Sequence, residues 1–61
     1  MGYCRGQAVY LETSELGRVS AVIQNIGDFD VSLKSVGDNR RLSLNLWELR
    51  DGRAILRKRT A

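Results

Sequence analysis

The sequence contains no histidine, no proline and a single cysteine, Cys4. One cysteine cannot form a disulfide within the chain, and without histidine the usual ligand set of a zinc site is incomplete. A chain this short buries only about 60% of the surface that its unfolded form exposes, so its stability is marginal. The domain therefore needs a well-packed core or association with another copy, and both alternatives stay open.

Catalytic side chains are scarce as well. Histidine is the most common general base near neutral pH, and Cys4 has no histidine to activate its thiol. Asp28 and Asp30 flank a predicted turn, where aspartate is more typical of turn formation than of a paired-carboxylate site. No glycine-rich loop precedes a helix, so no phosphate cradle of the usual kind is expected. We expect a binding protein rather than an enzyme, with no metal and no cofactor.

Long apolar runs are also missing. No stretch approaches the roughly 18 apolar residues of a membrane span, and no secretory signal is recognisable. The apolar fraction of 43% is normal for a globular chain. The sequence predicts a soluble, cytoplasmic protein without membrane contact, with a flexible lead-in at residues 1–6 and one small β-barrel domain at residues 7–61.

Charge is distributed unevenly along the chain. Residues 1–39 carry three basic and five acidic side chains, whereas residues 40–61 carry seven basic and two acidic ones. This asymmetry indicates a polyanion or an acidic protein as the partner. The alternative is that these side chains are the solvated faces of a small sheet.

Apolar and polar residues alternate in a pattern that predicts five short strands joined by glycine-containing turns. The strands are expected over residues 7–13, 18–26, 29–34, 40–49 with a break after 45, and 53–59. The second carries apolar side chains on both faces, which is typical of a strand that is central or bends from one sheet to another. Gly27-Asp28 predicts a tight hairpin between the second and third strands.

The break in the fourth strand is inferred from which side chains would share a face if the strand continued. Asp51-Gly52 is a hairpin signal, but pairing across it would place arginines on the leucine face of the preceding strand. The phase must therefore change between Leu46 and Leu49, through a bulge or a short 3₁₀ turn. Asn45 followed by Glu48 resembles a small capping box, which favours the turn.

Several of these features occur together in one known class. An early glycine (Gly6), an apolar first strand, a turn ending in Leu16-Gly17 and the run 18–23 leading into a β-meander resemble an SH3-like small barrel, including its KOW-like branch. The resemblance covers about residues 6–59 and rests on pattern. It implies an all-β fold, a five-stranded SH3-like barrel or a rolled antiparallel sheet, with a 3₁₀ turn over 45–49 before the last strand.

The basic C-terminal third supplies the candidate site. Arg53, Arg57 and Arg59 alternate along the last strand, and Arg40 and Arg41 begin the preceding strand and are expected to lie alongside that row. We predict a β-surface that contacts the phosphate backbone of DNA or RNA. The predicted contact residues are Arg40, Arg41, Arg53, Arg57, Lys58 and Arg59.

Two aromatic side chains could add base stacking to this surface. Tyr10 or Trp47 would stack on bases if exposed, although Trp47 is expected in the core of so small a domain. The competing hypothesis is a protein-interaction module, such as a small inhibitor, adaptor or accessory protein acting on an acidic partner or through an open sheet edge. The sequence leaves open the choice between DNA, RNA and protein, and it leaves open homo-oligomerisation.

Overall fold

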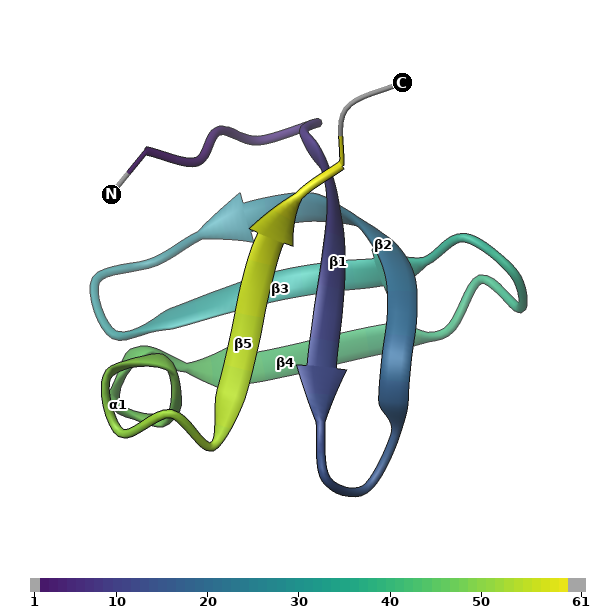
Figure 1. Cartoon of the computed structure of the whole chain (residues 1–61). Helices are drawn as coiled ribbons and strands as arrows, with labels where there is room; N and C mark the ends of the chain where they lie inside the picture. Colours follow the sequence, from purple (N-terminus) through teal and green to yellow (C-terminus); the bar gives the residue numbers. More distant parts are fainter. Residues whose placement is uncertain (1, 60–61) are drawn as a thin grey trace.

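The computed structural model describes residues 2–59. Its elements are β1 (Ala8–Thr13), β2 (Gly17–Ile26), β3 (Asp30–Ser35), β4 (Arg41–Asn45), α1 (Leu46–Arg50) and β5 (Ala54–Lys58). The five strands form one antiparallel sheet in the order β4-β3-β2-β1-β5 (Figure 1). The all-β prediction is confirmed, and the rolled sheet is consistent with a small barrel.

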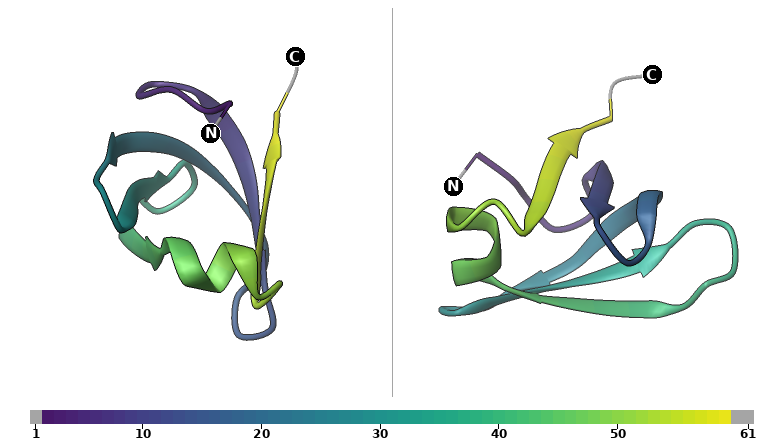
Figure 2. Two further views of the ribbon diagram at one scale, coloured as in Figure 1. Left: turned by 90° about the vertical axis from the view of Figure 1, so that its left-hand side faces the viewer. Right: turned by 60° about the horizontal axis from the view of Figure 1, so that its bottom comes forward.

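The sheet is rolled because β2 pairs with a different strand along each half. Its first half pairs with β1 as far as Val22, and its second half pairs with β3 from Ala21 onward. A β-bulge between Ile23 and Asn25 shifts the register, and a bulge of this kind bends its strand. As a result β3 and β4 cross behind β1 and β5 (Figures 1 and 2). The prediction that this strand is central and bends is confirmed.

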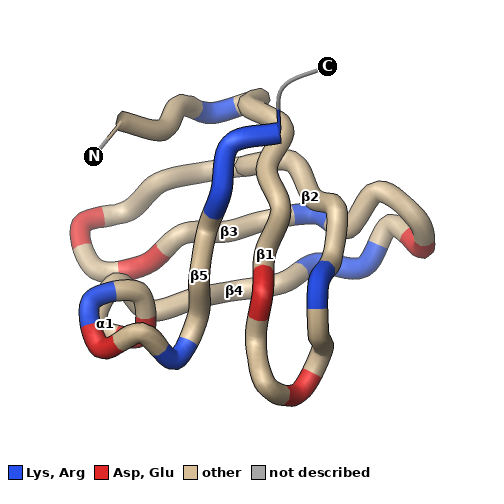
Figure 3. The backbone as a smooth tube through the Cα atoms, in the orientation of Figure 1, with Lys and Arg blue, Asp and Glu red and all other residues tan. Residues whose placement is uncertain are grey.

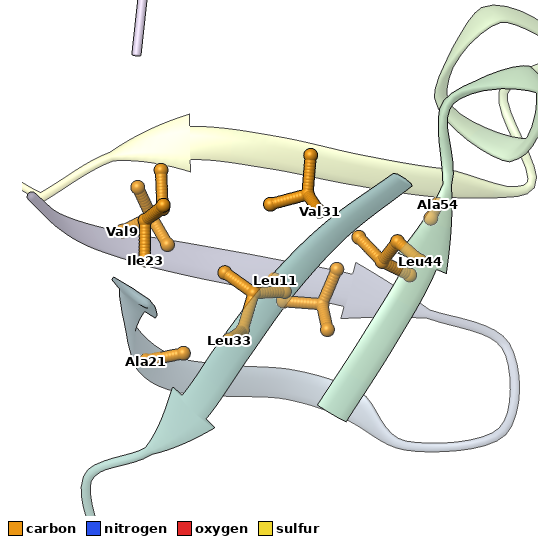
Figure 4. Close-up of a cluster of buried hydrophobic side chains, with 8 residues drawn as sticks. All are labelled: Val9, Leu11, Ala21, Ile23, Val31, Leu33, Leu44 and Ala54. Carbon is orange, nitrogen blue, oxygen red and sulfur yellow. The ribbon is translucent and has the colours of Figure 1, made fainter. Parts of the chain in front are cut away.

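The core lies inside the roll. All five strands contribute inward side chains, and tyrosine and leucine side chains from the N-terminal segment, β4, α1 and β5 pack around them. The buried apolar residues drawn in Figure 4 are Val9, Leu11, Ala21, Ile23, Val31, Leu33, Leu44 and Ala54. Because side chains alternate between the two faces of a strand, the residues between these point outward.

The break after β4 lies where the sequence places it, but it is a five-residue α-helix and not a 3₁₀ turn. The Glu48 carboxylate accepts a hydrogen bond from the Asn45 N–H at 3.1 Å, as in a capping box. Leu46 and Leu49 share one side of the helix and pack on the core. Trp47 turns outward with 42% of its surface exposed, so its expected place in the core is wrong.

Asp51-Gly52 ends this helix and does not form a hairpin. Gly52 has a φ of +80°; its N–H donates to the Leu49 carbonyl, and the Arg53 N–H donates to the Glu48 carbonyl. These two bonds define a Schellman motif, which uses the same left-handed glycine that a tight hairpin would use. The last strand is thereby directed away from β4, and β5 pairs with β1.

The turn between β2 and β3 is shifted by one residue from the predicted position. The Gly27 N–H donates to the Asp30 carbonyl at 2.8 Å, so Asp28 and Phe29 form the turn itself. Phe29 is consequently outside the strand and is 82% exposed. The alternation that places Phe29 in line with the inward residues of β3 ends at the turn.

The N-terminal segment makes specific contacts with the sheet. The Gly6 N–H donates to the Ile23 carbonyl at 2.7 Å, and the Tyr3 hydroxyl donates to the Leu56 carbonyl at 2.8 Å. Tyr3 also packs against the core. A flexible lead-in over residues 1–6 stays a prediction, but residues 3–6 are in contact with β2 and β5.

Residues 2–59 contain no helix long and apolar enough to cross a membrane. The cytoplasmic location stays a prediction.

Shortening a core side chain should destabilise the domain strongly. Leu33 is 1% exposed at the centre of the roll, so Leu33→Ala should lower the free energy of unfolding by about 2–5 kcal/mol. Leu16→Ala is the matched control, because Leu16 is 48% exposed and its loss should change stability by less than about 0.5 kcal/mol. Urea denaturation followed by circular dichroism measures both. Equal losses in the two variants would contradict the assigned core.

Candidate functional site

Five basic side chains occupy outward positions of the rolled sheet. These residues occupy the positions that alternate with the inward-facing ones, so their side chains point away from the core. We call this set the basic outer face; its members are Arg18, Lys34, Arg41, Arg57 and Arg59. Figure 3 shows basic positions at the upper end of β5 and around the right-hand ends of β3 and β4.

One part of the basic outer face surrounds Tyr10 on β1. The guanidinium carbon of Arg18 lies 4.2 Å from the centroid of the Tyr10 ring, and that of Arg59 lies 6.0 Å away. Arg57 pairs with Tyr10 across the β1–β5 ladder and forms a 3.4 Å salt bridge with Glu12. These contacts hold two guanidinium groups against one aromatic ring, the geometry of a cation–π interaction.

The Tyr10 ring is therefore in contact with arginines. A base that stacked on this ring would have to displace Arg18 or Arg59. The arrangement favours contacts between guanidinium groups and phosphates over contacts between the ring and bases. The predicted stacking role of Tyr10 stays a prediction.

The second part of the basic outer face is a pair of like charges. Lys34 on β3 lies directly opposite Arg41 on β4. The hydrogen bond from the Ser35 N–H to the Arg40 carbonyl fixes the phase of the ladder, and it makes Lys34 and Arg41 a non-hydrogen-bonded pair. In such a pair the Cβ atoms are about 4.5–5.5 Å apart, and like charges there are destabilising.

Among residues 2–59, no carboxylate lies within 4 Å of the charged nitrogen atoms of Lys34 or Arg41. Within the part of the chain that the structure describes, the salt bridge between Arg57 and Glu12 is the one ion pair within 4 Å. Lys34 and Arg41 are thus held side by side without an acidic partner among residues 2–59.

The two parts of the basic outer face are joined by one cross-strand row. Arg59 is next to Ala8, Ala8 is opposite Val22, Val22 is opposite Lys34, and Lys34 is opposite Arg41. The row crosses all five strands at about 4.8 Å per strand and follows the curve of the sheet. It carries cations at both ends and alanine and valine in the middle.

Three of the six predicted contact residues lie on this face: Arg41, Arg57 and Arg59. Arg40 is in the turn immediately before Arg41. Lys58 pairs with the buried Val9, so it leans to the other side, and its ammonium lies 5.8 Å from the centre of the Tyr3 ring. Arg53 is at the end of the α1–β5 connection, over the Trp47 ring at 5.3 Å.

The predicted neighbourhood of Arg40 and Arg41 is therefore wrong. β4 and β5 occupy opposite ends of the strand order, and β5 lies beside β1. The structure brings Arg41 together with Lys34, and it brings Arg57 and Arg59 together with Arg18. Sequence reasoning did not include Arg18 or Lys34. If the strands on either side of the turn at residues 36–39 are paired symmetrically, Lys34 lies opposite Arg41, so the sequence contained a signal for this pair. No local pattern indicates that Arg18 and Arg59 both approach Tyr10.

The turn before Arg41 contains a carboxylate with a shifted pKa. A hydrogen bond with the Ser35 side chain lowers the pKa of Asp38, and the Arg40 N–H, which donates to the Asp38 carboxylate at 3.3 Å, lowers that pKa further. The positive charge of Arg40 acts in the same direction. Asp38 thus stabilises the turn that places Arg40 and Arg41 at the start of β4.

The described residues include acidic side chains and one cysteine, which are types that can bind a metal ion or form a disulfide. Across residues 2–59 no three histidine, cysteine, aspartate or glutamate side chains are grouped to hold a metal ion. The thiol of Cys4 is exposed and unpaired in a disulfide.

Acidification should reveal the role of Asp38. Its pKa is lower in the folded chain than the ordinary value of 3.8, so its contribution to stability is present above that value and is lost as pH falls through the folded pKa. We expect Asp38→Asn to be less stable than the wild type at pH 6, and the difference to shrink at pH 3. Urea denaturation at the two pH values measures this, and a difference that does not depend on pH would contradict it.

Comparisons with known proteins give one kind of match. No protein-family model matches the chain, and no solved structure does. The chain is 29% identical over 59 residues to "Sin3 histone deacetylase corepressor complex component SDS3" of Bos taurus and of Pongo abelii, and 27% identical to that of Mus musculus. Each alignment covers 97% of this chain and 18% of the relative. The chain is therefore similar to one short segment of these corepressor components.

Proposed function

We propose that this chain is a small binding domain of the SH3-like barrel class, and that its basic outer face contacts the phosphate backbone of nucleic acid. A role in binding and not in catalysis is part of the proposal. The observation that carries it is the Lys34–Arg41 pair, in which two cations face the same side of adjacent strands without a carboxylate among the described residues. A phosphate between them would remove the repulsion that the fold alone leaves in place.

The wider charge distribution supports a polyanion over a single small anion. The row from Arg59 to Arg41 crosses the whole sheet, and Arg18 adds a further cation next to Arg59 through the shared Tyr10 ring. The sheet is curved (Figure 2). Cations distributed over the outer side of a curved sheet suit a flexible or bent backbone better than a flat surface. Contacts of this kind fix position and affinity, and they carry no base sequence information.

A second candidate function is protein interaction. The relatives are described as components of a histone deacetylase corepressor complex, and this chain is similar to a short segment of them. A domain inside a larger assembly can contact a protein and nucleic acid through separate surfaces. Such a role would be consistent with chromatin-associated binding.

Removing the charges of Lys34 and Arg41 should weaken nucleic-acid binding and make the affinity less dependent on salt concentration. Each phosphate contact that is lost lowers the slope of log K against log salt by about one, so Lys34→Gln with Arg41→Gln should lower it by about two. The change in affinity should be similar for different base sequences. Fluorescence anisotropy of labelled single-stranded and double-stranded DNA and RNA, at salt concentrations from about 50 to 200 mM, measures the slope.

The control removes the same charge from another part of the molecule. Arg50 is in α1 and Arg53 follows it, so Arg50→Gln with Arg53→Gln should leave the slope nearly unchanged. The Lys34 and Arg41 double variant should also melt no lower than the wild type, because it relieves repulsion. Equal changes of slope in the two double variants, or no binding by the wild type at low salt, would contradict the proposal.

A further inference from the structure

The free edge of β4 is a second surface with unused binding groups. β4 ends the strand order, and no strand lies beyond it in the view that brings the lower side of the molecule forward (Figure 2). The bonds from the Leu46 N–H to the Phe29 carbonyl and from the Ser35 N–H to the Arg40 carbonyl fix which residues face β3. By alternation, the backbone groups of Arg41, Ser43 and Asn45 point away from β3.

One of these outward groups already has a partner. The Asn45 N–H donates to the Glu48 carboxylate, which caps α1 and closes that end of the edge. The N–H and C=O groups of Arg41 and Ser43 have no partner strand among the described residues. Four backbone groups are thus arranged to pair with an added strand, as in β-augmentation.

The other edge of the sheet, on β5, is partly covered against pairing with another strand. On β5 the Leu56 carbonyl points away from β1 and accepts a hydrogen bond from the Tyr3 hydroxyl. Lys58 is on the same strand, and an edge lysine discourages pairing with another chain. On β4, Arg41 also adds a charge, but no side chain among residues 2–59 hydrogen-bonds the outward backbone groups of Arg41 and Ser43.

A groove of about 990 Å³ opens beside the β4 edge. Ser43 and Leu44 line it together with the β1–β2 turn on one side and the beginning of β5 on the other. The exposed apolar side chains of Leu16 and Ile55 belong to its walls, at 48% and 42% exposure. An extended chain along β4 would therefore also contact apolar groups.

The β1–β2 turn and the connection from α1 to β5, which form the walls, limit what fits the groove. Both stand in front of β4 and extend past its edge (Figures 1 and 2). The groove between these segments and β4 has room for a single extended peptide. A second copy of this sheet would bring its own projecting turns into the same space, so the shape favours an isolated strand over a β4–β4 dimer.

The charged residues that line the groove indicate which side chains a bound peptide should carry. Glu12, Glu15 and Glu48 line the groove. Glu12 pairs with Arg57 and Glu48 accepts a hydrogen bond from the Asn45 N–H, whereas Glu15 has neither kind of partner within the described chain. The two arginines of the lining are turned toward aromatic rings, Arg18 toward Tyr10 and Arg53 toward Trp47. The groove therefore offers a carboxylate to a basic side chain.

We propose that the free edge of β4 binds an extended segment of a partner protein by strand addition. Residues of the segment opposite Leu42 and Leu44 would share their face and enter the groove, so these positions should be apolar with one lysine or arginine near Glu15. Residues opposite Arg41 and Ser43 would face outward, and a basic side chain opposite Arg41 is disfavoured because like charges would be paired. The added strand would use the backbone groups of Arg41, whereas the phosphate contacts proposed above use its side chain, so this proposal does not depend on them.

A synthetic peptide tests the proposal on the full chain. The probe is acetyl-Thr-Val-Thr-Lys-Thr-Val-Thr-amide, titrated into ¹⁵N-labelled protein with amide shifts as the readout. We expect saturable shifts in residues 41–45 and 14–17, with a Kd of about 1 mM or tighter. Shifts confined to other parts of the chain would overturn the proposal. No shifts at a peptide concentration well above about 1 mM would also overturn it.

Two peptide controls separate strand addition from unspecific attraction. The same peptide with alternate amide nitrogens methylated cannot donate to the Arg41 and Ser43 carbonyls, and its binding should fall at least about tenfold. A peptide with glutamate in place of lysine should bind more weakly to the wild type but should recover with Glu15→Lys. Binding that does not change with methylation would overturn the proposal.

A variant pair in β4 makes the same test from the protein side. Ser43→Pro removes an N–H that points to solvent, and proline is tolerated on the exposed side of an edge strand. It should reduce peptide binding at least about tenfold, whereas Ser43→Thr keeps the N–H and should bind normally. The dispersion of the ¹⁵N amide signals of Ser43→Pro shows whether the variant is folded. If it is not folded, the methylated peptide decides. Self-association of the wild type that Ser43→Pro abolishes would replace the peptide with a second copy and overturn the proposal.

Discussion

The bend in β2 is the constraint on which the rest of the structure depends. One strand pairs with β1 along its first half and with β3 along its second, and the bulge between Ile23 and Asn25 lets it turn between them. This turn places the inward side chains of the two halves of the sheet face to face, so that eight apolar residues of the described chain are buried between them. Without the bend, the sheet would leave one apolar face in water, and a short chain has no other layer to cover it.

Rolling a sheet without closing it leaves two edges, and the chain treats them differently. On β5 the Tyr3 hydroxyl binds an outward carbonyl, and a lysine is present on the same edge. On β4 the Glu48 carboxylate caps only the end next to α1. The helix thus does two things at once: it redirects the chain from β4 to β5 across the open side, and it leaves the middle of the β4 edge accessible beside the groove.

The same roll determines where the charges gather. Apolar side chains fill the interior, so the basic residues that alternate with them must point outward, and the register places Lys34 against Arg41. Tyr10 is central on the outer face and holds Arg18 and Arg59 although these arginines come from strands on opposite sides of β1. The result is a cationic surface assembled from every part of the chain, including the N-terminal part in which acidic residues predominate.

Short-range patterns in the sequence determined the five strands, the helix cap and the outward direction of Arg57 and Arg59. Alternation has a period of two residues, and a capping box spans only four, so both are visible in a local window. Trp47 is expected inside because so small a domain has few large apolar groups, but Leu46 and Leu49 take the core side of the helix and leave Trp47 on its outer side. Asp51-Gly52 was misread because a left-handed glycine serves a helix end and a hairpin equally well.

Only the tertiary structure decided which strands are neighbours. Local sequence does not reveal that β5 lies against β1, so it could not place Arg18 next to Arg59 or separate Arg40 and Arg41 from the β5 row. It also could not show that the β4 edge stays open, whereas the Lys34–Arg41 pair follows from symmetric pairing about the turn at residues 36–39. Strand pairing over long separations is set by the burial of the whole core, and the surfaces it creates are properties of the assembled sheet.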